Sequence, residues 1–356
     1  MKYVPFLKLK QNEALALKDL NENDSQSILP FFDIPKPEIL DELNIIKKID
    51  QAKKYITKYW GKDKLFYIDN YDIPDQIEIQ NNHNYKFVLD SLDEFNYIPT
   101  VGVNRSPKHL SVTKMCINKK KLSIVALRLI PSDFEDYAII KDSLNDIIDN
   151  FKNYKIHLIL DNRIINDKKS AKQLFKNITQ FLNDYKIKEN HEKIILTGSS
   201  IQANIAEHVE TGKYKKILRY EWILYNLICH KMNTHFIYGD YGVVSPDYTD
   251  SDIEPELYQN VATPKIFYAH NRSFHIFRGK AFKTSPRGFK QYFDIAKILV
   301  KKFYYRGEHY SIGDKFIFDK SKEKDNPSSQ GNWYRMLNNS HITYVCRTLS
   351  KKLSVK

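Results

Sequence analysis

Eight short runs of apolar, β-branched and aromatic residues recur along this chain, and this recurrence constrains its fold more than any other feature. The longer segments between the runs carry apolar residues three and four positions apart, which is the spacing of amphipathic helices. Strands and helices that alternate in this way predict parallel strands joined by right-handed crossovers, and eight such units close into a TIM-like (β/α)8 barrel. The expected strands cover residues 3–10, 28–34, 65–71, 97–103, 122–130, 155–161, 193–199 and 235–241.

The segments between the strands are expected to be helices, and an open doubly wound α/β sheet is the alternative arrangement of the same pattern. Such sheets usually carry a glycine-rich turn after the first strand, whereas this chain continues there as KLKQNEA. Ser132 and Glu135 have the spacing of a capping box, which predicts a helix that runs from there to about Phe151. The expected helices cover residues 12–20, 38–59, 75–95, 108–117, 132–151, 169–185 and 215–230.

The pattern of alternating strands and helices ends at about residue 250. We therefore expect two parts, a barrel over residues 1–250 and a C-terminal α+β extension over residues 251–356 that packs on the barrel. Within the extension we expect an acidic loop at 251–261, a hairpin at 265–282, a helix at 288–303, a polar loop at 323–331 and a final strand at 341–349.

The composition restricts the partners and the compartment of the protein. The 356 residues carry a formal net charge of +13, and the basic residues are spread along the chain. This excess is typical of a polyanionic partner such as nucleic acid or a phosphorylated ligand, but a lysine-rich composition alone also produces it. No apolar run approaches the ~20 residues of a membrane span, and the three cysteines lie too far apart for a zinc site or a disulfide framework. We therefore expect a cytoplasmic protein with no membrane partner.

The signatures of several enzyme classes are absent from the sequence. It contains no GxSxG elbow, no P-loop, no HExxH and no GxGxxG motif. His270 and His275 are the one histidine pair whose spacing is compatible with a metal, and a place on an exposed hairpin is the simpler interpretation. The sequence thus disfavours a single-zinc hydrolase and identifies no specific cofactor.

The carboxyl ends of the predicted strands supply the candidate catalytic residues, because barrel enzymes of this type place their sites there. Carboxylates mixed with Lys and Arg can bind a phosphate or hold a divalent cation through several oxygen ligands. Alternatively, the lysines of the first strand point outward, and Asp69 and Asp72 merely cap the following helix. The candidate catalytic residues are Lys8, Lys10, Asp33, Asp161 and Asp240, and Asn104, Ser199 and Ser200 stand at further strand ends.

Three charged residues are candidates for binding a ligand. Arg128 lies inside the apolar run LSIVALRLI, so it must be paired with another group in the fold. Arg219 and Glu221 stand near the start of a helix, where a structural salt bridge is the alternative to a binding role.

The C-terminal extension adds candidates for contact with a polyanion. Arg278 has the charge to clamp a phosphate. The segments 304–306, with Tyr305 and Arg306, and 333–335 combine aromatic rings with positive charge, which suits stacking on nucleic-acid bases. Packing in the core of the extension is the alternative, since aromatic residues mainly supply buried area.

Several stretches taken together resemble the phage-type beta protein family. They are YVPFLKLKQNEALALKDL and ILPFFDIP near the start, Arg219–Trp222, GDYG at 239–242, and RGFKQYFDIAK…YYRGEHYSIGDKFI…NWYRMLNNSHITYVCRTLS at the end. The resemblance covers nearly the whole chain. Members of this family usually carry Glu where Asp33 stands here, and they often carry paired histidines where this chain has Ser340 and His341.

This resemblance implies a barrel protein of bacteria or phages with a setting in phage–host conflict, and it implies no particular reaction. If similarity to the family marks a site, the site includes Lys8, Lys10, Glu13, Asp33, Arg128, Asp161, Arg219, Glu221 and Asp240, with His341 as a further binding residue.

Three functions remain in competition. The first is a binding module of an antiphage defence system, which recognises nucleic acid or a partner protein of that system. The second is a phosphoester- or nucleotide-directed hydrolase, in which strand-end aspartates hold a divalent cation or act as base while Lys and Arg clamp the phosphate. The third is a barrel that has lost catalysis. Carboxylates that converge on a common point would favour the enzyme, whereas carboxylates that pair off with Lys and Arg would favour a structural role.

Overall fold

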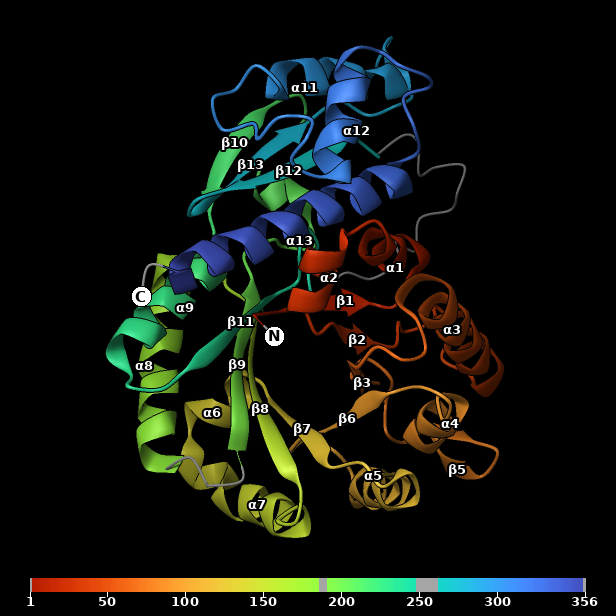
Figure 1. Ribbon diagram of the computed structural model, residues 1–356, viewed down its shortest axis with the longest axis vertical. Helices are drawn as coiled ribbons and strands as arrows, with labels where there is room; N and C mark the ends of the chain where they lie inside the picture. Colours follow the sequence, from red (N-terminus) through yellow and green to blue (C-terminus); the bar gives the residue numbers. More distant parts are fainter. Residues whose placement is uncertain (1, 186–190, 248–261, 355–356) are drawn as a thin grey trace.

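The computed structural model describes residues 2–185, 191–247 and 262–354 (Figure 1). Eight parallel strands form a closed barrel in the order β1-β11-β9-β8-β7-β6-β3-β2, so neighbours in the ring follow the order of the chain. Each expected strand overlaps one of them, and the TIM-like α/β fold is confirmed. The barrel strands are β1 (Tyr3–Lys8), β2 (Phe31–Asp33), β3 (Phe66–Asp69), β6 (Tyr97–Val101), β7 (Ile124–Leu129), β8 (Lys155–Ile164), β9 (His191–Ser199) and β11 (Phe236–Asp240).

The inside of the barrel is a packed core. Alternate residues of each strand point inward, and the inward residues are mostly apolar, with aromatic rings from β1 and β2 in contact at the centre. The rings of Phe6 and Phe31 stack with their centroids 4.4 Å apart, and Tyr67 packs beside Phe31 at 5.7 Å. Charged inward side chains gather at the carboxyl ends of the strands, whereas at the opposite end His157, near the start of β8, is buried and shares a hydrogen bond of 2.7 Å with the hydroxyl of Tyr67.

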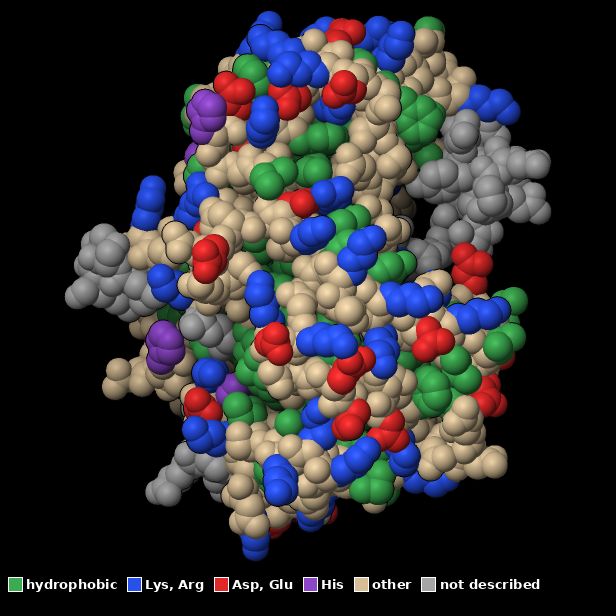
Figure 2. Space-filling view, turned by 45° about the vertical axis from the view of Figure 1, so that its right-hand side comes forward, with side chains coloured by type: hydrophobic (Ala, Val, Ile, Leu, Met, Phe, Trp, Pro, Cys, Tyr) green, Lys and Arg blue, Asp and Glu red, His purple; other side chains and the backbone are tan. Residues whose placement is uncertain are grey.

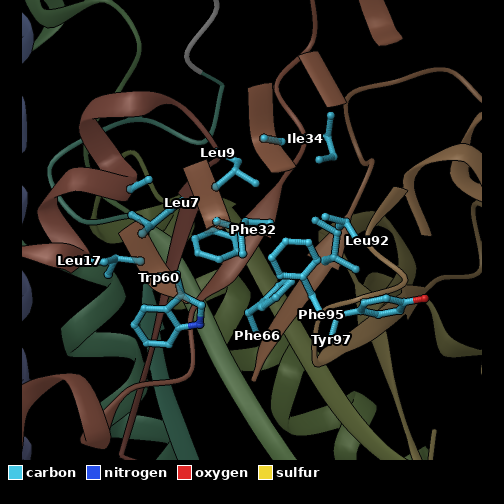
Figure 3. Packing of buried hydrophobic residues seen from close by; sticks show 14 of the residues in the cluster. Leu7, Leu9, Leu17, Phe32, Ile34, Trp60, Phe66, Leu92, Phe95 and Tyr97 are labelled. Atoms are coloured by element: carbon cyan, nitrogen blue, oxygen red, sulfur yellow. The ribbon is translucent and has the colours of Figure 1, made fainter. Parts of the chain in front are cut away.

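Helices cover the outside of the barrel. Figure 3 shows how the outward residues of β2 and β3, Phe32 and Phe66, pack against side chains such as Leu17, Trp60 and Leu92 from the surrounding helices. The helices of this layer are α1 (Gln11–Lys18), α2 (Glu22–Ser27), α3 (Glu42–Tyr55), α4 (Asn84–Ser91), α5 (Pro107–Lys120), α6 (Pro131–Glu135), α7 (Tyr137–Asn150), α8 (Lys168–Tyr185) and α9 (Tyr220–Lys231). None of the described helices combines the length and the apolar composition of a membrane span.

The predicted capping box is wrong, and so is the single helix that it was expected to begin. Pro131 begins α6, which makes Asp133 the third helical residue, and the Asp133 carboxylate accepts the backbone N–H of Ile130 at 2.8 Å. Asp136 then interrupts the helix and caps α7 by accepting the N–H of Ala138 at 3.1 Å. The local hydrogen bonds of two aspartates therefore divide one expected helix into two.

The C-terminal extension contains a three-stranded antiparallel sheet in the order β10-β13-β12. The hairpin predicted at 265–282 is confirmed, since it forms β12 (Lys265–His270) and β13 (Ser273–Arg278). The third strand, β10 (Tyr214–Leu218), was expected to begin a helix, and it pairs instead with β13. The helices of the extension are α11 (Gln291–Leu299), α12 (Ile312–Ser321) and α13 (Gln330–Ser354).

The final strand predicted at 341–349 is wrong, because these residues lie in the middle of α13. Their β-branched and aromatic content is typical of strands, but Ile342, Val345, Cys346 and Leu349 recur at helical spacing and pack into the core between α1 and the barrel. Figure 1 shows α13 running across the molecule between the barrel and the sheet of the extension. The boundary expected at residue 250 stays a prediction, and the acidic loop expected at 251–261 lies outside the described residues.

Candidate functional site

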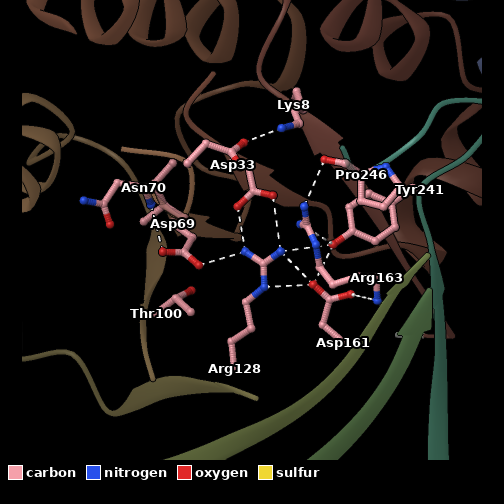
Figure 4. A network of polar contacts seen from close by, with 12 residues as sticks. Lys8, Asp33, Asp69, Asn70, Thr100, Arg128, Asp161, Arg163, Tyr241 and Pro246 are labelled. Carbon is pink, nitrogen blue, oxygen red and sulfur yellow. Dashed lines mark hydrogen bonds and ion pairs between the residues drawn. The ribbon is translucent and has the colours of Figure 1, made fainter. Parts of the chain in front are cut away.

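Arg128 lies at the centre of the carboxyl end of the barrel, surrounded by three aspartates from neighbouring strands (Figure 4). Its Nη1 donates to Asp33 Oδ1 at 2.8 Å and to Asp69 Oδ2 at 2.9 Å, and its Nε and Nη2 donate to Asp161 Oδ2 at 3.0 and 2.7 Å. These four side chains converge because β2, β3, β7 and β8 are parallel, and their carboxyl ends therefore lie at the same rim of the barrel. Three predicted site residues, Arg128, Asp33 and Asp161, are therefore brought together here.

The charges of this cluster stabilise one another away from water. Burial disfavours the charge of Arg128, but the facing carboxylates outweigh burial and hold its pKa well above the ordinary value. Burial also raises the pKa of Asp161, but Arg128 and then Arg163 outweigh this and leave that pKa below its usual value. The pKa of Asp33 stays raised by burial, even though Arg128 lowers it. The cluster is a set of mutually dependent ion pairs.

Aromatic rings enclose the Arg128 guanidinium on both sides. Its Cζ lies 4.4 Å from the ring centroid of Tyr71 and 5.0 Å from that of Phe31, and its Nη2 donates to the hydroxyl of Tyr241 at 3.0 Å. Arg163 lies against the outer part of Tyr71 at 4.7 Å. The carboxylates at the mouth of the barrel thus pair with arginine and fill the space, which is the arrangement that favours a structural role for them.

Two further ion pairs lie at this rim. Lys8 forms an ion pair with Asp72, and Arg105 donates to the second oxygen of Asp69 at 2.6 Å. Within the described residues, no group of three or more His, Cys, Asp or Glu side chains is arranged to hold a metal ion. The strand-end aspartates Asp33 and Asp161 hold a guanidinium, whereas the hydrolase alternative had them hold a divalent cation or act as base.

Asp240 does not join this cluster. Because Tyr241 points into the barrel, its neighbour Asp240 points outward and is buried against α13. There it accepts a hydrogen bond from Tyr238 at 2.8 Å and from Arg219 Nη2 at 3.3 Å, and it lies 2.8 Å from His341 Nε2. Grouping Asp240 with the aspartates of the barrel mouth was therefore wrong.

Arg219 and Glu221 belong to the same outer network as Asp240. Arg219 Nε donates to Glu221 Oε1 at 3.0 Å, and the other oxygen of Glu221 accepts from the hydroxyl of Ser200. All of these side chains are buried. They join β9, β11 and α9 to α13, so this network holds the extension on the barrel.

A cavity of about 470 Å³ opens between the barrel rim and the extension. Its barrel side is formed by the segments that follow β1, β9 and β11, which is the end of the barrel where sites of this fold lie. Its other side is formed by β12, by the start of α13 and by the rings of Phe282 and Phe289. The volume is that of a site for a small-molecule ligand.

Three residues that line this cavity each carry one buried polar atom with no hydrogen-bond partner within the described part of the chain. These atoms are Glu13 Oε2, Gln202 Oε1 and Asn338 Nδ2. The other end of each amide is occupied, since Gln202 Nε2 donates to Asn166 at 3.0 Å and Asn338 Oδ1 accepts from Val243 N at 3.1 Å. Buried polar groups are normally paired, so these three side chains have hydrogen-bonding capacity that the described contacts do not use.

Two ionisable groups of the cavity have pKa values shifted from their ordinary values. Burial raises the pKa of Glu13 to about 8, although Lys10 and Lys8 lower it. Burial, and then the charge of Arg278, lower the pKa of Lys265 to about 8. Near neutral pH the cavity therefore presents a protonated carboxyl group together with the positive side chains of Lys10 and Lys265. Groups perturbed in this way are concentrated at functional sites.

The remaining predicted binding residues serve the interior of the extension. Arg278 Nη1 donates to the carbonyl of Val209 at 2.8 Å, and Arg306 Nη1 donates to the carbonyl of Ala269 at 2.7 Å. Tyr305 donates to the carbonyl of Asp314 at 2.9 Å. These contacts correspond to the packing alternative rather than to a surface that stacks on bases.

Two other sequence interpretations also change. Trp333 is buried, and Arg335 donates to Asp19 at 2.6 Å, so this segment joins the extension to α1. The prediction that His270 and His275 lie exposed on a hairpin is wrong for His275. This residue is buried, and its ring centroid lies 3.7 Å from that of Tyr304.

Sequence reasoning missed Tyr71, Arg105, Arg163 and Tyr241 at the barrel mouth, and Gln202, Lys265 and Asn338 at the cavity. The period-2 alternation of β11 was a usable signal for Tyr241, since the inward positions run Ile237, Gly239, Tyr241. Lys265 and Asn338 carry no such signal, because they reach the cavity from the extension through contacts distant in the sequence.

Comparison with known proteins agrees with the resemblance stated from the sequence. Comparison with curated proteins gives no match. Among solved structures, a type I 3-dehydroquinate dehydratase from Clostridium difficile is similar at 12% sequence identity and a TM-score of 0.34, over 56% of this chain and 75% of that chain. A sequence model of the family described as Beta protein matches residues 3–347, and this chain therefore belongs to the Beta protein family.

Proposed function

We propose that this protein binds a phosphorylated ligand of nucleotide size in the cavity between the barrel rim and the extension. The observation that carries this proposal is that three residues lining a cavity of about 470 Å³, Glu13, Gln202 and Asn338, each carry a buried polar atom without a partner among the described residues. A protonated carboxyl, an amide donor and an amide acceptor match the hydrogen-bonding edge of a nucleobase. The volume admits such a ligand.

Other groups of the cavity suit the phosphate of a nucleotide and the flat faces of its base. Lys265 makes no ion pair or hydrogen bond with its side chain among the contacts of the described residues, so its amine is available to a phosphate oxygen. Phe267, Phe282 and Phe289 supply aromatic faces for a flat ring. On the face drawn in Figure 2, Lys and Arg side chains are interspersed with Asp and Glu from the barrel to the extension. On this face the charges form no single large basic surface, so we propose the cavity as the feature that selects the ligand.

The resemblance noted in the sequence implies a setting in phage–host conflict, and on that basis we propose that the protein acts as a sensor or effector of a defence system. Hydrolysis of the ligand is the alternative that the sequence raised. Asp33 and Asp161 would take part only after leaving Arg128, so binding is the function that the described contacts favour.

Titration calorimetry with adenosine monophosphate, adenosine and inorganic phosphate tests the proposal. The nucleotide should bind more tightly than either fragment, because the base and the phosphate meet different groups of the cavity. Lys265→Met should weaken nucleotide binding and leave adenosine binding unchanged. The matched control is Lys172→Met, which removes an exposed lysine of α8.

Two outcomes would contradict the proposal. One is the absence of binding by any nucleoside monophosphate up to millimolar concentration. The other is an unchanged affinity in Lys265→Met. Phosphate release measured in the same samples decides between binding and hydrolysis, and phage plating on cells that carry the wild type or Lys265→Met tests the defence setting.

A further inference from the structure

A row of aromatic and imidazole rings lies on the face of the extension sheet opposite the cavity. Tyr214 on β10 donates or accepts a hydrogen bond with His275 Nδ1 at 2.7 Å, and the ring of His275 stacks on Tyr304 at 3.7 Å. The ring of His270 follows, 5.9 Å from both Tyr304 and Phe303. The two ends of the row are open to solvent, because Tyr214 is 47% exposed and Phe303 is 90% exposed.

Burial and neighbouring positive charges lower the pKa values of both histidines of this row. Burial, and then His270, Lys216 and Lys302, lower the pKa of His275 to about 4. Burial, and then Arg306 and Lys216, lower the pKa of His270. Among the described residues, the charges that shift the pKa values of these two histidines are positive and include no carboxylate.

Two lysines near this row, and an arginine in the hairpin turn next to His270, make no ion pair among the described residues. Lys216, Lys302 and Arg272 are exposed, and the ion pairs and side-chain hydrogen bonds found among the described residues include none from these three. Lysines on an edge strand such as β10 also serve to prevent pairing with other sheets. That explanation does not extend to Lys302 and Phe303, which follow α11, or to Arg272 in the hairpin turn.

We propose that this surface, which we call the β10 platform, binds single-stranded nucleic acid. It consists of Tyr214, Lys216, His270, Arg272, Lys302 and Phe303. Exposed rings offer stacking faces to bases, and unpaired cations neutralise phosphates, which is the combination that single-strand binding requires. A duplex keeps its bases stacked on one another, so it cannot use the ring of Phe303 in this way.

The β10 platform is separate from the cavity and independent of the function proposed for it. Successive residues of a strand point to opposite faces of its sheet. Phe267 of β12 lines the cavity, whereas His270 of the same strand belongs to the platform. A variant of the platform therefore leaves nucleotide binding in the cavity unchanged, and the two proposals fail separately.

Fluorescence anisotropy of the full chain with labelled oligodeoxythymidine and oligouridine of about 20 nucleotides tests the platform, at about 50 mM salt and above. Phe303→Ala should weaken binding about 10-fold or more through the loss of base stacking. Lys216→Ala and Lys302→Ala should each reduce the slope of log affinity against log salt by about 0.7. Ile139→Ala and Lys172→Ala are the matched controls, because Ile139 is a 79% exposed apolar residue on α7 and Lys172 is exposed on α8.

Three results would overturn this proposal. The first is that no oligonucleotide binds at low salt. The second is that the platform variants and the control variants lose the same affinity. The third is that vesicles of phosphatidylserine and phosphatidylcholine, but no oligonucleotide, bind the wild type and lose that binding in Phe303→Ala, which would assign the surface to an anionic membrane. Phe303→Ala removes an almost fully exposed side chain, so the fold is expected to persist in each case.

Discussion

His341 Nε2 lies 2.8 Å from Asp240 Oδ2, so the long last helix of the extension is joined directly to the last strand of the barrel. The same carboxylate also accepts from Tyr238, from Arg219 and from Tyr3. All of these groups are buried. Burial raises the pKa of Asp240, but His341 and then Arg219 outweigh burial and hold this pKa well below its usual value.

Asp240→Asn should therefore destabilise the protein by about 3–5 kcal/mol at pH 7, since Arg219 and His341 lose a buried charged partner. A depressed carboxyl pKa contributes stability that is present above the unfolded pKa of about 4 and is lost as the pH falls through the folded pKa. The difference between wild type and variant should thus narrow only below about pH 4. Urea denaturation of the wild type and of Asp240→Asn at pH 7 and pH 3 measures this difference in the free energy of unfolding. Asp142→Asn, at an exposed aspartate of α7, is the control, and equal losses in both variants would contradict the prediction.

Arg128→Met should destabilise the fold by about 3–5 kcal/mol, because it removes the cation that pairs with all three buried carboxylates of the cluster. The loss should shrink as the pH is lowered toward the carboxyl pKa values, since protonated carboxyl groups no longer repel. Arg287→Met is the control. Arg287 pairs with Asp294 at 2.7 Å on the surface, where ion pairs contribute little. If both variants unfold at the same urea concentration, the barrel-mouth cluster does not stabilise the fold.

The barrel could be predicted from the sequence, because each strand is a continuous apolar run that is buried on both faces. The β10 strand could not, since Tyr214–Leu218 are largely exposed and pair with a strand about sixty positions later. The charged residues at the strand ends were predicted individually. Their grouping depended on which face of the strand each occupies, and this separated Asp240 from Asp161. The cavity escaped prediction because Lys265 and Asn338 reach it only through the packing of the extension.

Glu13→Gln should increase stability near pH 8. A carboxyl group whose folded pKa is about 8 instead of 4.5 contributes stability that is fully present below pH 4.5 and is lost as the pH rises to about 8. The accumulated loss is about 5 kcal/mol at most, from about 1.4 kcal/mol for each pKa unit. A neutral amide of the same shape avoids this loss. Chemical denaturation from pH 4.5 to pH 8 should show a declining stability for the wild type and a flatter curve for the variant, and parallel curves would contradict the assignment.

The pH dependence of nucleotide binding tests the role of Lys265. Its pKa of about 8 means that the amine loses its positive charge as the pH rises from 7 to 9, while the phosphate of adenosine monophosphate remains fully charged over that interval. The affinity should therefore fall about 10-fold between pH 7 and pH 9. Lys265→Arg should bind with an affinity that no longer depends on pH in this range, because a guanidinium keeps its charge. Glu13 ionises over the same interval and weakens binding in the same direction, so the series is repeated in Glu13→Gln. A fall that persists in Lys265→Arg but disappears in Glu13→Gln would assign the pH dependence to the carboxyl group and remove Lys265 from the phosphate site.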